Sequence, residues 1–284
     1  MERIKKEADI IIGNDQGTQT DPTGLNQEYT KTSTYGLHNE VGIITLCHAK
    51  TFNSFSDPMR DSIAAAIHLH EKDPSVKVIC LRSSDKKVFC PGADLKGLVN
   101  VTRRSQVSFD MFRNLDLALY HCSKPIICAV NKLALGGGFE LALHCDIILA
   151  SSNAKFGLPE ITLGLLPGLG GTSIAKYIGK HNAMKLILTG ERIKAERALQ
   201  LGIVQAVYPE EELHREQLKL ASKIAEFSGS VLALAKQATK FSSDNSSVSR
   251  EFERNLFQSS LGLRGSKEGL NAFLNKRKPD YTGI

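Results

Sequence analysis

The chain has 284 residues, a formal net charge of +6 and a sparse set of aromatic residues without tryptophan. A chain of this length can bury a substantial core, as one large domain or two small ones. The low aromatic content argues against a base-stacking nucleic-acid surface, and the scattered basic residues suit an anionic small ligand or plain solvated surface. No apolar run approaches the roughly 20 residues that span a bilayer.

The six cysteines lie mostly within apolar runs and form no C-x-x-C pair, which is typical of buried free thiols in a reducing compartment. Adjacent histidine and cysteine residues, such as His144 and Cys145, lack the spacing of a zinc site, so we expect no metal. The first ten residues mix both charges without the hydrophobic region of a signal peptide. We therefore expect an intracellular protein of the mitochondrial matrix or the cytoplasm.

Residues 1–38 are polar with little apolar periodicity, and we expect a flexible N-terminal extension there. Ordered structure is expected to begin with a strand at 41–47. Further elements are predicted from β-branched runs, apolar periodicity and helix caps. In chain order they are a helix at 56–73, a strand at 76–83, an amphipathic helix near 103–121, a strand at 125–135 and a strand at 145–152.

From about residue 170 the pattern becomes mostly helical, with one short strand within 203–209. The segment 211–229 reads as a helix that Gly229 ends. Its apolar stripe, which indicates core or a subunit interface, consists of Leu213, Leu220, Ile224 and Phe227. Strands that alternate with helices and give way to a helical part predict a single α/β domain.

Two glycine-bearing loops offer backbone N–H groups. In "VFCPGADLK" (88–96), Gly92 makes a turn, after which Ala93 and Asp94 begin a helix whose first N–H groups lack internal partners. In "LALGGGFE" (133–140), three glycines let a second backbone strip approach a ligand closely. Two such donors can stabilise the oxyanion of a thioester carbonyl. Two tight turns with helix caps are the alternative.

Glu140 and Glu160 each lie in an apolar context. Such surroundings raise the pKa of a carboxyl group, so one could stay protonated as an acid while the other serves as a base. Structural alternatives are a helix-dipole complement for Glu140 and a loop carboxylate for Glu160. A glycosidase pair lacks its aromatic sugar platform. The run "GLLPGLGGT" (164–172) lacks the lysine of a phosphate-binding loop.

Four long blocks resemble the successive signatures of the enoyl-CoA hydratase/isomerase (crotonase) family. They are "FCPGADLK", "KPIICAVNKLALGGGFELALHCDIILAS", "KFGLPEITLGLLPGLGGT" and "MKLILTGERIKAERALQLGIVQAVYP". The resemblance runs in order from about residue 40 to 281. It implies a crotonase-like domain over 39–284, with a spiral of ββα turns over about 39–200. A helical C-terminal oligomerisation part over about 201–284 would form trimers or dimers of trimers.

The resemblance also implies a CoA thioester substrate, with CoA as part of the substrate and no metal or redox cofactor. Ala93 and Gly137 match the two oxyanion-hole positions, and Glu140 and Glu160 match the two catalytic glutamates. Gly168 matches a glycine close to the reacting water. Residues that match CoA-binding positions are Ala93, Asp94, Leu95, Lys96 and Gly137, together with Lys50 and Asn53.

Because both glutamates are present, the resemblance favours hydration. The expected enzyme is a hydro-lyase that converts a trans-2-enoyl-CoA to a 3-hydroxyacyl-CoA in fatty-acid β-oxidation or branched-chain amino-acid breakdown. Alternatives are a 3-methylglutaconyl-CoA hydratase, an enoyl-CoA isomerase, or a silent CoA-binding scaffold. RNA binding, as in one branch of the family, is a further alternative. However, the matching helix offers only Arg60 and Lys72 as permanently charged basic residues. Lys132 departs from a usual glycine, which predicts a reshaped turn.

Overall fold

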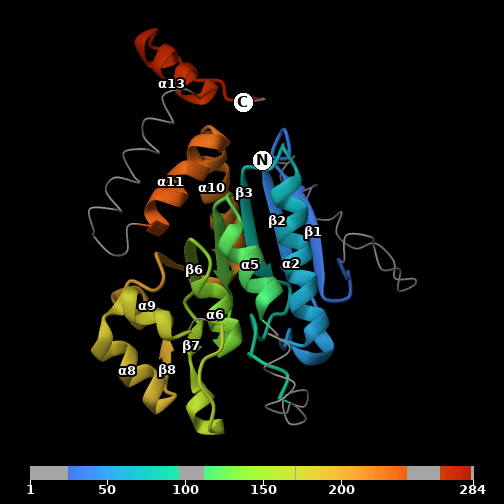
Figure 1. The fold of residues 1–284 in the computed structure, drawn as a ribbon, viewed down its shortest axis with the longest axis vertical. Helices are drawn as coiled ribbons and strands as arrows, with labels where there is room; N and C mark the ends of the chain where they lie inside the picture. Colours follow the sequence, from blue (N-terminus) through green and yellow to red (C-terminus); the bar gives the residue numbers. More distant parts are fainter. Residues whose placement is uncertain (1–24, 96–111, 170, 242–262, 283–284) are drawn as a thin grey trace.

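The computed structural model describes residues 25–95, 112–169, 171–241 and 263–282. Among these residues, the strands form a six-stranded sheet in the order β1-β2-β3-β4-β6-β9 and a three-stranded sheet in the order β5-β7-β8 (Figure 1). The strands are β1 (Thr30–Tyr35), β2 (Val41–Leu46), β3 (Val78–Ser83), β4 (Ile126–Val130), β5 (Leu133–Leu135), β6 (Ile147–Ser151), β7 (Lys155–Gly157), β8 (Arg192–Lys194) and β9 (Ala206–Tyr208).

Helices follow most of the strands. The 3-10 helices are η1 (Ala49–Thr51), η2 (Pro159–Leu163) and η3 (Gly171–Ile174). The α-helices are α2 (Asp57–Lys72), α5 (Arg113–His121), α6 (Gly137–Leu143), α7 (Ala175–Ile178), α8 (Lys180–Thr189), α9 (Ala195–Gln200), α10 (Glu210–Ala225), α11 (Gly229–Phe241) and α13 (Arg264–Leu274). None of the helices within the described ranges has the length and apolarity to cross a membrane.

The chain repeats a unit of a strand in the large sheet, a short strand in the small sheet and a helix. The run β4, β5 and α6 is one such unit, and β6, β7 and η2 form the next. The predicted single strand at 125–135 is therefore wrong in one respect, because the chain leaves the large sheet after β4. The Asn131 amide donates to the Asp85 carbonyl at this bend. The predicted α/β class and ββα repeat are confirmed.

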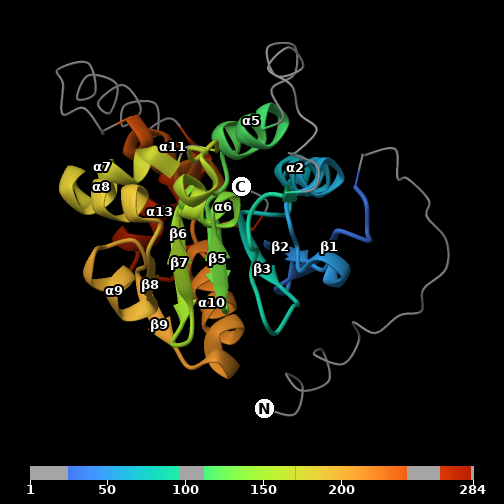
Figure 2. The same cartoon turned by 90° about the horizontal axis from the view of Figure 1, so that it is seen from below.

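The large sheet is buried on both faces. Ile79 and Leu81 of β3 pack into a core with α2 and α5, whereas Val78 and Cys80 pack against α10. Figure 2 shows α2 and α5 on one side of the large sheet and α10 on the other. Within this sheet the neighbouring strands β2, β3, β4, β6 and β9 are parallel. Parallel strands covered on both sides have continuous apolar sequences. This arrangement holds the carboxyl ends of the strands rigidly.

The expected start of ordered structure at residue 41 is wrong. Strand β1 lies inside the segment 1–38 and pairs antiparallel with β2 along all six residues. The Thr30 hydroxyl hydrogen-bonds the Ser62 hydroxyl of α2 at 2.5 Å. A polar strand at the edge of a sheet lacks an apolar pattern, so its order comes from backbone pairing. Residues 1–24 of the expected extension lie outside the described residues.

Two helix predictions also need correction. Helix α10 ends at Ala225, and Gly229 begins α11 instead of ending α10. Phe227 lies in the connection and is 51% exposed, so it leaves the apolar stripe of α10. The turn separates α10, which packs on the large sheet, from α11, which contacts α13. The helix expected near 103–121 is described only as α5, since residues 103–111 lie outside the described ranges.

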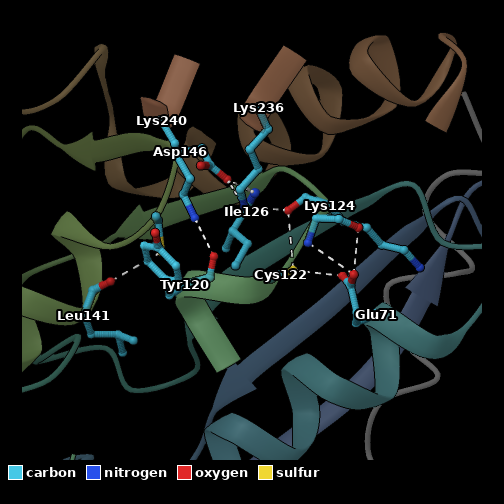
Figure 3. Close-up of polar contacts among 11 residues, drawn as sticks. Glu71, Tyr120, Cys122, Lys124, Ile126, Leu141, Asp146, Lys236 and Lys240 are labelled. Carbon is cyan, nitrogen blue, oxygen red and sulfur yellow. Dashed lines mark hydrogen bonds and ion pairs between the residues drawn. The ribbon is translucent and has the colours of Figure 1, made fainter. Parts of the chain in front are cut away.

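Two lysines of helix α11 connect it to the rest of the protein (Figure 3). Lys236 donates to an Asp146 carboxylate oxygen at 2.6 Å and to the Lys124 carbonyl at 2.8 Å. The same Asp146 oxygen accepts the Ile126 N–H at the start of β4. Lys240 donates to the Tyr120 carbonyl at the end of α5. One carboxylate therefore links the C-terminal helices to β4, the strand that leads to the glycine loop.

At each of the three consecutive glycines, another group lies where a side chain would otherwise be. Gly136 has φ +49°, and a Cβ there would lie 2.8 Å from Glu160 Oε1. A Cβ on Gly137 would lie 2.9 Å from the Phe55 ring. On Gly138 it would lie 2.2 Å from the Cys90 carbonyl oxygen. The glycines thus let the loop before α6 contact the strand-like segment that carries Cys90.

We predict that Gly138→Ala lowers the free energy of unfolding by about 3 kcal/mol, because the new methyl group would overlap a backbone carbonyl that cannot move aside. The matched control is Gly229→Ala, whose Cβ would meet Lys77 Cγ at an ordinary 3.5 Å. We expect that control to stay within about 1 kcal/mol of the parent chain. Denaturant unfolding of the two variants measures the difference, and equal stabilities would contradict it.

A second prediction concerns the α11 anchor. Lys236→Met should lower the free energy of unfolding by about 3 kcal/mol, because Asp146 would keep its charge in a partly buried site without its cation. Lys219→Met removes an exposed pair with Glu216 and should cost less than about 1 kcal/mol. Thermal unfolding in low and high salt checks both. A Lys236→Met chain as stable as Lys219→Met would refute the anchoring role.

Candidate active site

The two glycine loops predicted from the sequence lie against each other. Cys90 forms a parallel bridge with Ala134, and the Leu135 N–H donates to the Cys90 carbonyl at 3.1 Å. Gly92 has φ +100°, and a Cβ there would lie 2.8 Å from the Leu135 carbonyl oxygen and 3.4 Å from the Gly137 nitrogen. The backbone of residues 92–93 is therefore adjacent to the start of α6.

Both predicted oxyanion donors have suitable local geometry. The Phe55 N–H donates to the Gly92 carbonyl at 2.8 Å, and the Asp94 N–H donates to the Phe55 carbonyl at 3.2 Å. In such a parallel bridge the residue between the two bonds, Ala93, directs its own N–H away from Phe55. Gly137 is the first residue of α6, where N–H groups have no partner within the helix.

Glu140 is held by the loop that precedes η3. The side chain lies on α6 and is 1% exposed. Its Oε1 accepts the N–H groups of Leu169 at 2.8 Å and Gly171 at 2.6 Å. Burial raises the pKa of Glu140 to about 7, against the lowering effect of these N–H donors, and the like charge of Glu160 raises it further. The group can therefore exchange a proton near neutral pH.

Glu160 lies in η2, and its side chain is next to Gly136. Its Oε1 is next to Gly136, and its Oε2 is buried with no hydrogen-bond partner among the described residues. Burial raises the pKa of this carboxyl group as well. The structure thus brings together the two glutamates and both backbone donors that the sequence singled out, at the junction of β5, α6 and η2.

The residues expected to hold CoA are placed less uniformly. Asp94 and the half-exposed Leu95 follow Ala93 directly, whereas Lys96 lies outside the described residues. Lys50 is exposed and pairs with Glu28 at 3.0 Å. The Asn53 side chain is fully buried, and its contact with CoA stays a prediction.

Asn53 supports the segment 89–90, which precedes the Gly92 turn, from inside the protein. It has φ +62°, and its amide donates to Ser83 Oγ at 2.9 Å and to the Phe89 carbonyl at 3.0 Å. The Cys90 thiol in turn donates to the Asn53 carbonyl at 3.0 Å. Asn53 therefore positions Phe89 and Cys90, just before Pro91. The sequence pattern alone could not reveal this supporting role.

Gly168 adjoins the Glu140 loop, as a position near the reacting water would require. A Cβ on Gly168 would lie 2.9 Å from the Phe112 ring. The next residue, Leu169, is the one that donates to Glu140. Its proximity to a water molecule stays a prediction.

Several supporting residues were missed by sequence reasoning. Arg60, which the RNA-binding alternative treats as a surface cation, is buried and donates to the Phe55 carbonyl at 2.9 Å. It cannot serve as a nucleic-acid contact in this position. Lys132 pairs with Glu210 at the start of α10 and has no positive φ, so the turn accepts a side chain where the family usually has glycine. The Lys132 contact has no signal in the sequence, because it joins segments 78 residues apart.

Metal binding is not indicated by the side chains described here: no group of three or more His, Cys, Asp or Glu residues within those ranges has an arrangement that could hold an ion. The described cysteines are free thiols, five of the six buried. Burial raises the pKa of Cys80 and of Cys90 to about 12. Both side chains therefore act as small apolar groups in the core.

Comparison with known proteins gives a consistent result. Residues 36–283 match the family model described as enoyl-CoA hydratase/isomerase. The mitochondrial enoyl-CoA hydratase of Pongo abelii is 38% identical over 261 residues, which cover 91% of this chain and 89% of that protein. The 2,3-dehydroadipyl-CoA hydratase of Escherichia coli K12 is 37% identical over 245 residues, with coverages of 86% and 95%.

A solved structure agrees with the sequence relatives. The enoyl-CoA hydratase subunit I of Geobacillus kaustophilus superposes with a TM-score of 0.86 at 38% identity, covering 90% of this chain and 98% of that one. The family match over residues 36–283 includes the ranges of the glycine loops and of both glutamates. This chain therefore belongs to the enoyl-CoA hydratase/isomerase family, and its relatives support the hydratase activity, that of a hydro-lyase.

Proposed function

We propose that this hydratase adds water across the double bond of a trans-2-enoyl-CoA to give a 3-hydroxyacyl-CoA. The observation that carries the proposal is the buried Glu140, held by two backbone N–H groups. It lies near Glu160, on the helix whose first residue, Gly137, lies against Gly92. The CoA group enters as part of the substrate. All proton transfers are assigned to the two glutamates, so the proposed reaction uses no separate cofactor.

The proposed oxyanion hole acts on the thioester carbonyl. When water attacks C3, negative charge moves through the double bond to the carbonyl oxygen. The N–H groups of Ala93 and Gly137 would stabilise this charge more strongly in the transition state than in the substrate. Because Gly92 and Gly137 are in backbone contact, the two donors stay at a fixed separation without reorganisation.

We assign Glu140 as the base and Glu160 as the acid. Glu140 Oε1 accepts two N–H groups, which stabilise a carboxylate able to take a proton from water. The oxygen of that water bonds to C3, and Glu160 gives its proton to C2. Glu160 Oε2 is buried without a donor, an environment that favours the protonated form. The proton taken by one glutamate and the proton given by the other balance.

The relatives and the surface support proposals for the assembly, the pathway and the compartment. We propose a homotrimer or a dimer of trimers, supported by exposed apolar side chains on η2 and α8 such as Leu163 and Leu188. We propose a role in fatty-acid β-oxidation or branched-chain amino-acid breakdown. The name of the Pongo abelii relative supports the mitochondrial matrix; the cytoplasm is the alternative.

We predict that Glu140→Gln and Glu160→Gln each lower kcat for hydration of crotonyl-CoA by roughly 10²–10⁴-fold, since each removes one proton transfer. Binding of the CoA thioester should persist, because neither change alters the loops. The fall in enoyl thioester absorbance measures hydration, and equilibrium binding measures affinity. Glu211→Gln, an exposed change on α10, is the matched control. Turnover near that of the parent chain in both variants would reject the site.

The residual activity of Glu160→Gln can separate the two roles. In this variant Glu140 is the remaining carboxyl of the pair, and loss of the Glu160 charge moves the pKa of Glu140 from about 7 to a lower value. A base works only when deprotonated, so kcat/KM should rise with pH through that pKa. If Glu140 were the acid, kcat/KM would fall across the same range. Rate measurements from pH 5 to 9 distinguish these signs.

A further inference from the structure

His144 lies one helical turn after Glu140, at the carboxyl end of α6. Its backbone N–H donates to the Glu140 carbonyl at 3.1 Å, so the two residues belong to the same turn of the chain. Side chains four residues apart lie on the same face of a helix. His144 is half-buried and therefore faces the same neighbouring loop as Glu140.

Both side chains bind the same residue of that loop. His144 Nε2 lies 2.6 Å from the Leu169 carbonyl oxygen, and a carbonyl can only accept, so Nε2 carries the proton. The Leu169 N–H donates to Glu140 Oε1 at 2.8 Å. The Leu169 side chain is itself buried in the main core. The Leu169 residue is thus held at its N–H, its carbonyl and its side chain.

We propose that His144 is a positioning residue for the hydration reaction: by holding the Leu169 carbonyl, it keeps the backbone N–H groups of Leu169 and Gly171 on the Glu140 carboxylate. This inference rests on the proposed function. His144 touches no reacting atom in this arrangement. It acts through the loop, whose Leu169 and Gly171 N–H groups donate to Glu140 of α6.

The loop has a defined effect on Glu140. Its N–H donors lower the pKa of the carboxyl group, whereas burial and the charge of Glu160 raise it. Glu160, from η2, is the titratable group that acts on Glu140 there. If the loop moves away, the donors lengthen and the carboxylate loses both its alignment and part of its stabilisation.

The test compares His144→Met, which has similar bulk without a donor, with His144→Gln, whose amide N–H can reach the same carbonyl. For crotonyl-CoA we expect His144→Met to lower kcat roughly tenfold or more while KM changes little, since small misplacements of a catalytic group are costly. His144→Gln should restore most of the rate. His144→Leu replaces His144→Met if that chain does not fold.

A second readout separates positioning from general destabilisation. In the Glu160→Gln background, His144→Met should move the Glu140 limb of the kcat/KM profile to higher pH, and His144→Gln should leave it in place. An unchanged kcat for His144→Met, equal losses for the two substitutions, or an unmoved limb would each overturn the inference. Absence of hydration in the parent chain would instead reject the proposed function, so the two failures are distinguishable.

Discussion

The site depends on one buried carboxylate that is held by backbone N–H groups. Glu140 is buried at the start of α6, where a charge is costly. The N–H groups of Leu169 and Gly171 offset part of that cost. A group balanced in this way changes protonation near neutral pH, which is the property that general acid–base chemistry needs. The surrounding architecture serves to maintain this balance.

The glycine loop accounts for much of that architecture. Strand β5 and the segment at Cys90 run side by side, and the absence of side chains at residues 136–138 permits contacts with a carboxylate, a ring and a carbonyl. The same loop starts α6, so one short stretch supplies both an N–H donor and Glu140. Because α6 is rigid, the distance between donor and carboxylate is fixed by helix geometry.

Support for the site comes from distant parts of the chain. Asn53 donates to the Phe89 carbonyl and Arg60 to the Phe55 carbonyl, next to the Gly92 turn. His144 donates to the Leu169 carbonyl, in the loop that binds Glu140. Helix α11 reaches β4 through Lys236 and Asp146 (Figure 3). Such residues do no chemistry themselves. They restrict the motion of groups whose function requires positions accurate to a fraction of an ångström.

The sequence by itself determined the α/β class, the two glycine loops and the glutamate pair, because apolar periodicity and glycine cost are local properties. It misjudged β1, whose order comes from pairing with β2, and the strand at 125–135, which divides between two sheets. Only the tertiary structure decided that Asn53 is a support and that His144 and Glu140 share Leu169. Those contacts join residues far apart in the chain, and their partners are set by packing, which no local pattern encodes.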